Sequence, residues 1–110
     1  MRIHAAAQYS GTRAIRTRLP HKQTEPASFV YVLLASGGRS APRTYVGWTT
    51  DLERRLAKHN NGTGARSTRG RIWRLIYAEA FGSRRDAMRR EWHLKRDRAF
   101  RRTLRSNCEA

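Results

Sequence analysis

An arginine and a histidine share the predicted inner face of a short helix. Within residues 51–60, Leu52 and Leu56 stand four positions apart and mark the face that packs against the rest of the protein. Arg55 and His59 follow Leu52 by three and seven positions, which places them on that same face. A charge that is buried without a partner costs free energy. Either the pair is satisfied structurally, or it lines a cleft that binds an anion, and the spacing leaves both interpretations open.

Glu91 poses a similar question in a second predicted helix. It follows Ala87 by four positions and Met88 by three, beside the apolar face of a segment that is otherwise rich in cations. An inward carboxylate is a candidate ligand for a metal ion. The alternative is an ion pair with Lys95, four positions later, which is worth only about 0.2–0.5 kcal/mol. Taken alone, the spacing favours the ion pair.

Two tyrosines lie on neighbouring predicted strands. Tyr31 falls in the continuous apolar run 29–34, which is typical of a strand covered on both faces, and Tyr45 falls in 43–48. Gly47 leaves room for the close approach of a backbone or a ligand. Because tyrosine is common in protein cores, neither residue identifies a site by itself.

The elements that position these residues are predicted in the order β-β-α-β-α-α, which is an α+β fold with mixed layers. Thr50 and Glu53 form a capping box at the start of the first helix, and Ser83 begins a second one. The first two strands form an antiparallel hairpin around a loop that contains glycine and proline. The predicted strands span residues 29–34, 43–48 and 72–80, and the predicted helices span 51–60, 84–96 and about 97–106.

The chain is predicted to hold one domain at residues 28–106, between a basic arm at 1–27 and a short tail at 107–110. The arm contains Pro20 and Pro26 and shows no sustained periodicity, so we expect it to be poorly ordered. It could bind phosphates without specificity, or it could be an extension without a role in binding. A transit peptide is a weaker interpretation, because the segment has little amphipathic character.

The charge of the chain indicates the class of partner. Lys and Arg number 24 against 8 Asp and Glu, which gives a formal net charge of +16. A polyanion relieves this self-repulsion, and no predicted helix has the broad apolar face of a membrane-surface anchor, so nucleic acid is favoured.

The single cysteine excludes an intrachain disulfide and a cysteine-based zinc site. No apolar run approaches the roughly 20 residues of a membrane span, and we expect a cytoplasmic monomer.

Four short segments, taken in order, resemble the GIY-YIG nuclease superfamily, and in particular its small stand-alone bacterial branch. They span residues 29–31, 44–47, 51–60 and 84–95. The resemblance extends over about residues 29–105, and it departs from the family pattern where Phe29-Val30-Tyr31 lacks a glycine. It implies a small three-stranded antiparallel β-sheet flanked by helices, which agrees with the predicted order of elements.

The resemblance implies hydrolysis of phosphodiester bonds with one divalent metal ion, Mg²⁺ or Mn²⁺, held by Glu91. Tyr31 and Tyr45 would position or deprotonate the attacking water. Arg55 would neutralise negative charge on the phosphate in the transition state, and His59 would relay a proton or hold a tyrosine. Because the reference pKa of tyrosine is about 10, a nearby cation is needed to help whichever tyrosine serves as the base.

The predicted substrate is DNA, with single-stranded DNA preferred and duplex DNA, branched DNA and RNA left open. Unpaired bases could stack on Trp48 and Trp73, each worth about 1–3 kcal/mol, whereas Trp92 is expected in the core. The alternative is a non-catalytic nucleic-acid-binding protein on the same scaffold, which the presence of all the candidate catalytic residues argues against. The predicted nucleic-acid-binding residues are Trp48, Arg66, Arg69, Arg71, Trp73 and Lys95.

Overall fold

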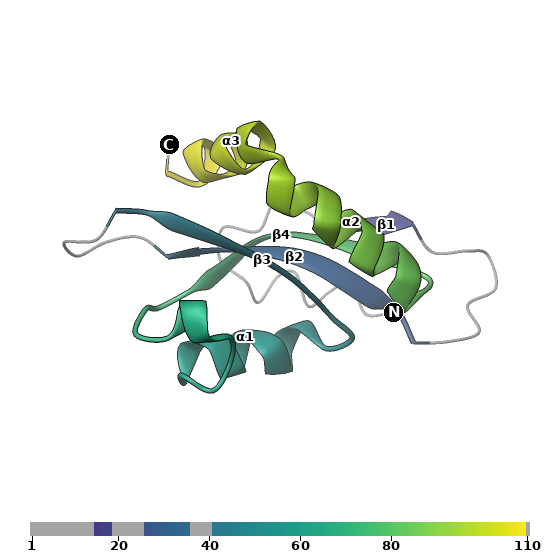
Figure 1. Ribbon diagram of the computed structural model, residues 1–110, viewed down its shortest axis with the longest axis horizontal. Helices are drawn as coiled ribbons and strands as arrows, with labels where there is room; N and C mark the ends of the chain where they lie inside the picture. The colour runs from purple at the N-terminus through teal and green to yellow at the C-terminus, as the bar shows by residue number, and fades with distance from the viewer. Residues whose placement is uncertain (1–14, 19–25, 36–40, 110) are drawn as a thin grey trace.

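The computed structural model describes residues 15–18, 26–35 and 41–109 of the chain. Its strands are β1 (Ile15–Arg18), β2 (Ser28–Ala35), β3 (Arg43–Thr49) and β4 (Arg74–Phe81). Its helices are α1 (Leu52–Asn60), the short 3₁₀ turn η2 (Arg66–Thr68), α2 (Arg84–Arg96) and α3 (Arg98–Glu109). Figure 1 shows one sheet with α1 on one face and with α2 and α3 on the other. The predicted α+β class and the predicted order of elements are confirmed.

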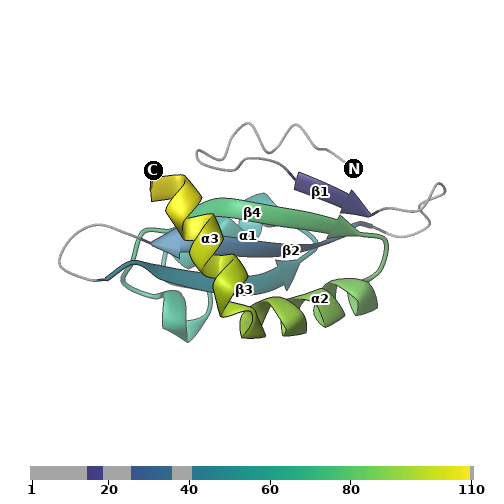
Figure 2. The same cartoon turned by 90° about the horizontal axis from the view of Figure 1, so that it is seen from above.

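Three antiparallel strands form the predicted sheet in the order β4-β2-β3, and β1 adds a fourth strand parallel to β4 (Figure 2). β2 lies between β3 and β4, and every residue from Ser28 to Ala35 is buried. This burial explains the continuous apolar sequence of β2, because its alternate side chains enter two different cores. β3 is the outer strand at the opposite side of the sheet from β1, and α2 runs alongside it.

Each face of β2 contributes to one core. Phe29, Tyr31 and Leu33 pack with Leu52 of α1 on one face. On the other face, alternate residues of β2 pack with buried residues of α2 and partly buried residues of α3. These are Val30, Val32, Leu34, Ala87, Leu94, Phe100, Leu104 and Cys108. The candidate site residues of α1 and α2 are therefore carried by helices on opposite faces of one sheet.

The start of α1 differs from the prediction by one residue. The N-cap is Asp51 and not Thr50, because the carboxylate of Asp51 accepts a hydrogen bond from the backbone N–H of Arg54 at 3.1 Å. The N–H of Asp51 in turn donates to the hydroxyl of Thr49 at 3.1 Å, which holds Asp51 in an extended conformation. The prediction that Ser83 is the N-cap of α2 is confirmed, since its hydroxyl accepts a backbone N–H of the first turn at 3.2 Å.

β4 begins at Arg74, two residues later than predicted. The side chain of Asn60, the last residue of α1, accepts from the N–H of Trp73 at 2.6 Å and donates to the carbonyl of Trp73 at 3.0 Å. Both backbone groups of Trp73 are therefore satisfied outside the sheet. Ile72, the other residue that the prediction placed in the strand, is 77% exposed.

Regular structure also forms outside the predicted domain. α3 continues beyond its predicted end to Glu109, because Cys108 extends by one more turn the apolar stripe that begins with Phe100 and Leu104. β1 lies within the segment predicted to be a poorly ordered arm and pairs with β4. Most of the rest of that predicted arm is outside the described residues. In the part of the chain that the structure describes, no helix combines the length and the apolar character needed to cross a membrane.

Candidate active site

Tyr31 and Tyr45 lie on the same face of neighbouring strands. In the register of β2 and β3, Tyr31 is opposite Gly47 and Leu33 is opposite Tyr45, so the two tyrosines are diagonal neighbours. Their ring centroids are 6.3 Å apart. Tyr31 is buried and Tyr45 is partly buried. The prediction that they occupy adjacent strands is confirmed.

Gly47 allows the ring of Tyr31 to lie against the backbone of β3. A β-carbon at residue 47 would stand 2.5 Å from the hydroxyl oxygen of Tyr31 and 3.1 Å from a ring carbon of Tyr45. Favourable contacts between non-bonded heavy atoms lie at about 3.5–4.0 Å, so a carbon at 2.5 Å forces one of the two groups to move. Gly47 is therefore required for the observed position of the Tyr31 phenol.

Arg55 and His59 lie on the face of α1 that packs on the sheet, as the positions of Leu52 and Leu56 predict. His59 is buried and satisfied by hydrogen bonds, whereas Arg55 is partly buried and lines a cavity. Arg54, the next residue along the chain, is exposed. His59 is therefore satisfied structurally, which is the first interpretation, and Arg55 lines a cavity, as the second interpretation requires.

A chain of three hydrogen bonds fixes the ring of His59. The hydroxyl of Thr68 donates its single proton to the carbonyl of Ala65 at 2.8 Å. It must therefore accept from the Nδ1–H of His59, which lies 2.8 Å away. With Nδ1 protonated, Nε2 of the neutral imidazole is an acceptor, and the hydroxyl of Tyr31 donates to it at 2.9 Å. Tyr31 thus faces a group that is able to accept its proton.

Burial is the main influence on the ionisation of these groups. It raises the pKa of Tyr31, with further increases from Tyr45 and Glu91, while Arg55 acts in the opposite direction. Burial and then the negative charge of Glu91 raise the pKa of Tyr45, again against Arg55. Burial and then the positive charge of Arg55 lower the pKa of His59 below its ordinary value of 6.5. At neutral pH both tyrosines are therefore protonated and His59 is neutral, as the hydrogen bonds require.

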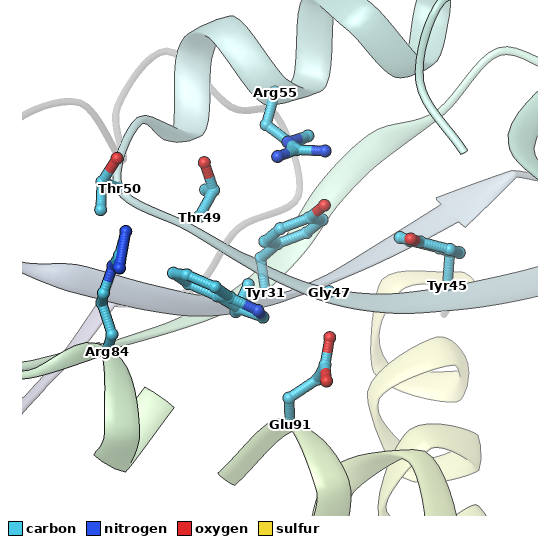
Figure 3. Close-up of a pocket in the computed structure, with 9 residues that line it drawn as sticks. Tyr31, Tyr45, Gly47, Thr49, Thr50, Arg55, Arg84 and Glu91 are labelled. Carbon is cyan, nitrogen blue, oxygen red and sulfur yellow. The ribbon is translucent and has the colours of Figure 1, made fainter. Parts of the chain in front are cut away.

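Glu91 reaches the site from the other face of the sheet. It lies four residues after Ala87 and three before Leu94, both buried, which places it at the margin of the inward face of α2. Its side chain is 21% exposed, and together with both tyrosines and Arg55 it lines a cavity of about 320 Å³. Figure 3 shows Arg55 extending from α1 and Glu91 from α2 on the other side of β3, with Gly47 and the tyrosines between them.

The donor set around Glu91 fits one type of metal ion. No group of three His, Cys, Asp or Glu side chains capable of holding a metal occurs among the described residues. Mg²⁺ and Mn²⁺ accept a single carboxylate with water and phosphate oxygens in the remaining positions, whereas zinc sites have three or four protein ligands. The ion pair predicted as the alternative is also present, since Nζ of Lys95 lies 3.8 Å from Oε2 of Glu91. Because this pair is partly exposed, it is weak and compatible with metal binding.

The predicted nucleic-acid-binding residues differ in accessibility. Trp48 is partly buried and lines the cavity. Arg66 and Arg69 are exposed, whereas Arg71 is partly buried and donates to a backbone carbonyl at 3.1 Å. Lys95 is exposed beside the carboxylate that lines the cavity. The structure therefore places Trp48 at the cavity and Lys95 next to Glu91 but outside the cavity lining, while the three arginines lie on the loop between α1 and β4.

The prediction that Trp73 stacks on bases is wrong. Only 3% of Trp73 is exposed, and its indole N–H donates to the carbonyl of Thr68 at 2.8 Å. Its ring also packs edge-on against Tyr45, with centroids 6.3 Å apart. The prediction that Trp92 lies in the core is wrong as well, because 53% of it is exposed. Trp73 therefore supports a site tyrosine, and Trp92 faces solvent.

Four residues at the site were not among the predicted site residues: Thr49, Thr50 and Arg84, which line the cavity, and Thr68. Thr68 holds the ring of His59, and no periodic pattern in its loop indicated this contact. Arg84 lines the cavity and precedes Glu91 by seven positions, or two helical turns, so helical spacing could have placed both on one face. The guanidinium carbon of Arg84 lies 5.9 Å from the ring centroid of Trp48, within the range of a cation–π contact.

Residues 27–104 match the model of the GIY-YIG catalytic domain. The chain belongs to the GIY-YIG family. A UPF0213 protein of Streptococcus agalactiae is 48% identical over 65 residues, which make up 58% of this chain and 69% of the relative. A UPF0213 protein of Halobacterium salinarum is 48% identical over 67 residues, or 60% of this chain and 82% of the relative. One from Clostridium perfringens is 41% identical over 70 residues, covering 63% and 71% of the two chains.

No solved structure matches the chain. The matched GIY-YIG segment includes every residue from Tyr31 to Glu91, and so it contains all the residues that meet at the cavity. The GIY-YIG family is a family of nucleases that generally use divalent metal ions, and the single carboxylate in the cavity is compatible with that chemistry.

Proposed function

We propose that this GIY-YIG protein is an endonuclease that hydrolyses phosphodiester bonds in DNA with one divalent metal ion. The observation that carries the proposal is that Tyr31, Tyr45, Arg55 and Glu91 come from four separate elements and line one cavity. A structural role would not explain why an arginine and a glutamate, carried by helices on opposite faces of the sheet, turn toward the same space (Figure 3). Opposite charges around a cavity suit a bound phosphate and a metal ion together.

Tyr31 is the better placed of the two tyrosines to act as the base. Its hydroxyl donates to Nε2 of His59, and the bond from His59 to Thr68 keeps that nitrogen free of a proton. As the oxygen of water bonds to phosphorus, the ester P–O bond would break and the departing alkoxide would take a proton from solvent water, while Tyr31 would take a proton from the attacking water. It would pass its own phenolic proton to His59 in the same step, so that no free phenolate forms in a site that raises the pKa of the phenol.

Arg55 and the metal ion would provide the positive charge that the phosphate needs. In the part of the chain that the structure describes, Arg55 forms no ion pair with an acidic side chain, so its guanidinium is available to a phosphate oxygen. Glu91 would hold the metal ion, which when bound neutralises charge on the phosphate and makes a coordinated water more acidic. Lys95 is exposed and can move away from Glu91 when the metal ion binds.

Single-stranded DNA is the proposed substrate form. Trp48 lines the cavity, and an unpaired base can stack on an indole more readily than a base within a duplex can. The net charge of +16 and the exposed Arg66 and Arg69 suit contacts with the phosphate backbone. A non-catalytic binding protein would explain the charge equally well, but it would not explain the residues that converge on the cavity.

An end-labelled cleavage assay tests the proposal. Single-stranded DNA, duplex DNA and RNA of one sequence are incubated with the full chain in Mg²⁺, Mn²⁺ or chelator. A Glu91→Gln chain purified in the same way controls for contaminating nucleases. We expect cutting by the wild type only with metal, and fastest on the single strand. Tight binding without cutting of any of the three would overturn the nuclease, and faster cutting of duplex or RNA would overturn the substrate preference alone.

We expect Gly47→Ala to lower turnover by about 100-fold, because a displacement of about 1 Å at a reacting group has an effect of that size. The added methyl group would meet the hydroxyl of Tyr31 and break its alignment with His59. Single-turnover cleavage measures the effect, and the midpoint of thermal unfolding and DNA binding in chelator serve as controls for the fold. Wild-type turnover in a stably folded variant would show that the position of this phenol does not limit the reaction.

We expect the cleavage rate to fall as the pH drops below 6.5, because only neutral His59 can accept the proton of Tyr31 and its pKa lies below that value. Its contribution to the free energy of unfolding falls in the same window, since the unfolded chain binds the proton at higher pH than the folded chain. Rates at saturating metal measured across this window test the expectation, with the exposed His93→Gln as a matched control. A midpoint above 6.5, or loss of the acid limb in His93→Gln, would contradict it.

A further inference from the structure

An apolar patch lies on the outer side of α2, away from the two cores. Trp92 is 53% exposed and Met88 is 50% exposed, and they are one helical turn apart. A single exposed apolar side chain is ordinary on a protein surface, but two adjacent ones on a helix with seven basic side chains form a distinct feature. Those basic residues are Arg84, Arg85, Arg89, Arg90, His93, Lys95 and Arg96.

Arg96 holds the ring of Trp92 in place. Its guanidinium carbon lies 3.6 Å from the ring centroid of Trp92, which is a close cation–π contact. Its Nη1 donates to the backbone carbonyl of Trp92 at 2.9 Å, so Arg96 contacts both the ring and the backbone of Trp92. The ring of His93 also contacts Trp92 edge-on, with centroids 5.1 Å apart. The indole therefore contacts Arg96 and His93 in the absence of a ligand, while half of its surface remains accessible.

The patch continues the surface that leads out of the cavity. Successive residues of a helix turn by about 100° about its axis. Glu91 lines the cavity. Around the helix axis from Glu91, the exposed side chains of α2 follow in the order Arg84, Lys95, Met88 and Trp92. No acidic residue of α2 interrupts that order. A polyanion bound in the cavity can therefore continue to Trp92 without passing a negative charge on this helix.

We propose that Trp92, supported by Arg96 and Met88, binds one unpaired base of a single-stranded DNA whose backbone continues from the cavity. The base stacks on the face of the indole opposite Arg96, and Lys95 contacts the intervening phosphate. A base-paired duplex does not expose the face of a base, so the patch selects for single-stranded DNA. Repulsion between the many cations disfavours a second copy of this basic chain as the occupant. This inference rests on the proposed nuclease function.

Binding measured in chelator, where no cutting is expected, tests the proposal with the full chain. Fluorescence anisotropy gives Kd for a labelled single strand and for the matching duplex. We expect Trp92→Ala to weaken single-strand binding by about tenfold, equivalent to about 1.4 kcal/mol, and to leave duplex binding unchanged. Trp92→Phe keeps an aromatic face and should restore most of the affinity. Ile72→Ala, which removes another exposed apolar side chain outside the patch, should match the wild type.

The outcomes separate this inference from the proposed function. Unchanged single-strand affinity in Trp92→Ala, or an equal loss on the duplex, would overturn the base site even if the wild type cuts DNA. If the wild type never cuts DNA but Trp92→Ala still loses affinity for the single strand alone, the base site is supported and the nuclease function is overturned. A wild type that self-associates through Trp92, shown by sedimentation of Trp92→Ala as a smaller species, would assign the patch to a second copy of the chain and overturn the proposal.

Discussion

Replacing Arg55 with alanine is expected to lower the turnover number for DNA cleavage by about 100- to 1,000-fold, the loss typical of one fixed donor of transition-state charge. The guanidinium of Arg55 extends from α1 into the cavity that Glu91 lines from the other side. It also acts on the site electrostatically, since its positive charge lowers the pKa values of Tyr31, Tyr45 and His59. Single-turnover cleavage with enzyme in excess isolates the chemical step from DNA binding.

Arg54→Ala is the matched control for Arg55→Ala. It removes the same charge from the neighbouring residue, but Arg54 is exposed, and its contact with the N-cap is made by the backbone. Surface substitutions of this kind change free energies by about 0.5 kcal/mol at most, so its turnover should stay within about twofold of the wild type. Equal losses in the two variants would mean that Arg55 acts only through the total charge of α1.

Nuclear magnetic resonance provides a second readout for Arg55. Because the charge of Arg55 lowers the pKa of His59, that pKa should rise in Arg55→Ala. It should stay below 6.5, because burial is the larger cause of the shift. No movement of the pKa would contradict the placement of the guanidinium near the imidazole.

Much of the site was predictable because local periodicity determines which side of a helix meets the sheet. The spacing of Leu52 and Leu56 places Arg55 and His59 inward on α1, and the structure has them there. In the same way, Ala87 places Glu91 at the margin of the inward face of α2. These inferences need only the helical repeat, which the sequence carries within each segment.

The contacts that were missed join segments that no local pattern relates. Thr68 accepts from His59, and its own backbone carbonyl accepts the indole N–H of Trp73, so one 3₁₀ turn organises both rings. The side chain of Asn60 forms hydrogen bonds with the N–H and the carbonyl of Trp73, so β4 starts later than predicted. Sequence composition could identify Trp73 as aromatic but not as buried, because its burial depends on where this loop folds.

Trp92 illustrates the opposite limit of sequence periodicity. Its segment contains few apolar residues, so an apolar face drawn through all of them includes Trp92. The buried positions of α2 are Ala87 and Leu94, and Trp92 is turned away from them by more than a right angle about the axis. Trp92 and the neighbouring Met88 are both exposed, and adjacent exposed apolar side chains of this kind mark interaction sites more often than single ones do.

The Glu91→Gln chain is expected to lose at least about 1,000-fold in metal-dependent cleavage, since removal of the metal's contribution raises the barrier by several kcal/mol. Glutamine keeps the shape of the side chain but is a poor ligand for Mg²⁺ or Mn²⁺. The substitution also releases Lys95 from its ion pair and makes the helix more positive, so DNA binding should be unchanged or slightly tighter. Cleavage and anisotropy assays on one preparation would therefore show cutting lost and binding kept.

The matched control for Glu91→Gln is Asp86→Asn on the same helix. It makes the same change in charge at an exposed carboxylate that does not line the cavity with Glu91. The Asp86 carboxylate stabilises the N-terminus of α2 by only about 0.3–1 kcal/mol. The Asp86→Asn chain should therefore cut at nearly the wild-type rate. If Glu91→Gln cut as fast as Asp86→Asn and remained sensitive to chelator, the metal ion would be held elsewhere. In that case Glu91 would serve only to pair with Lys95, the role that its spacing alone favours.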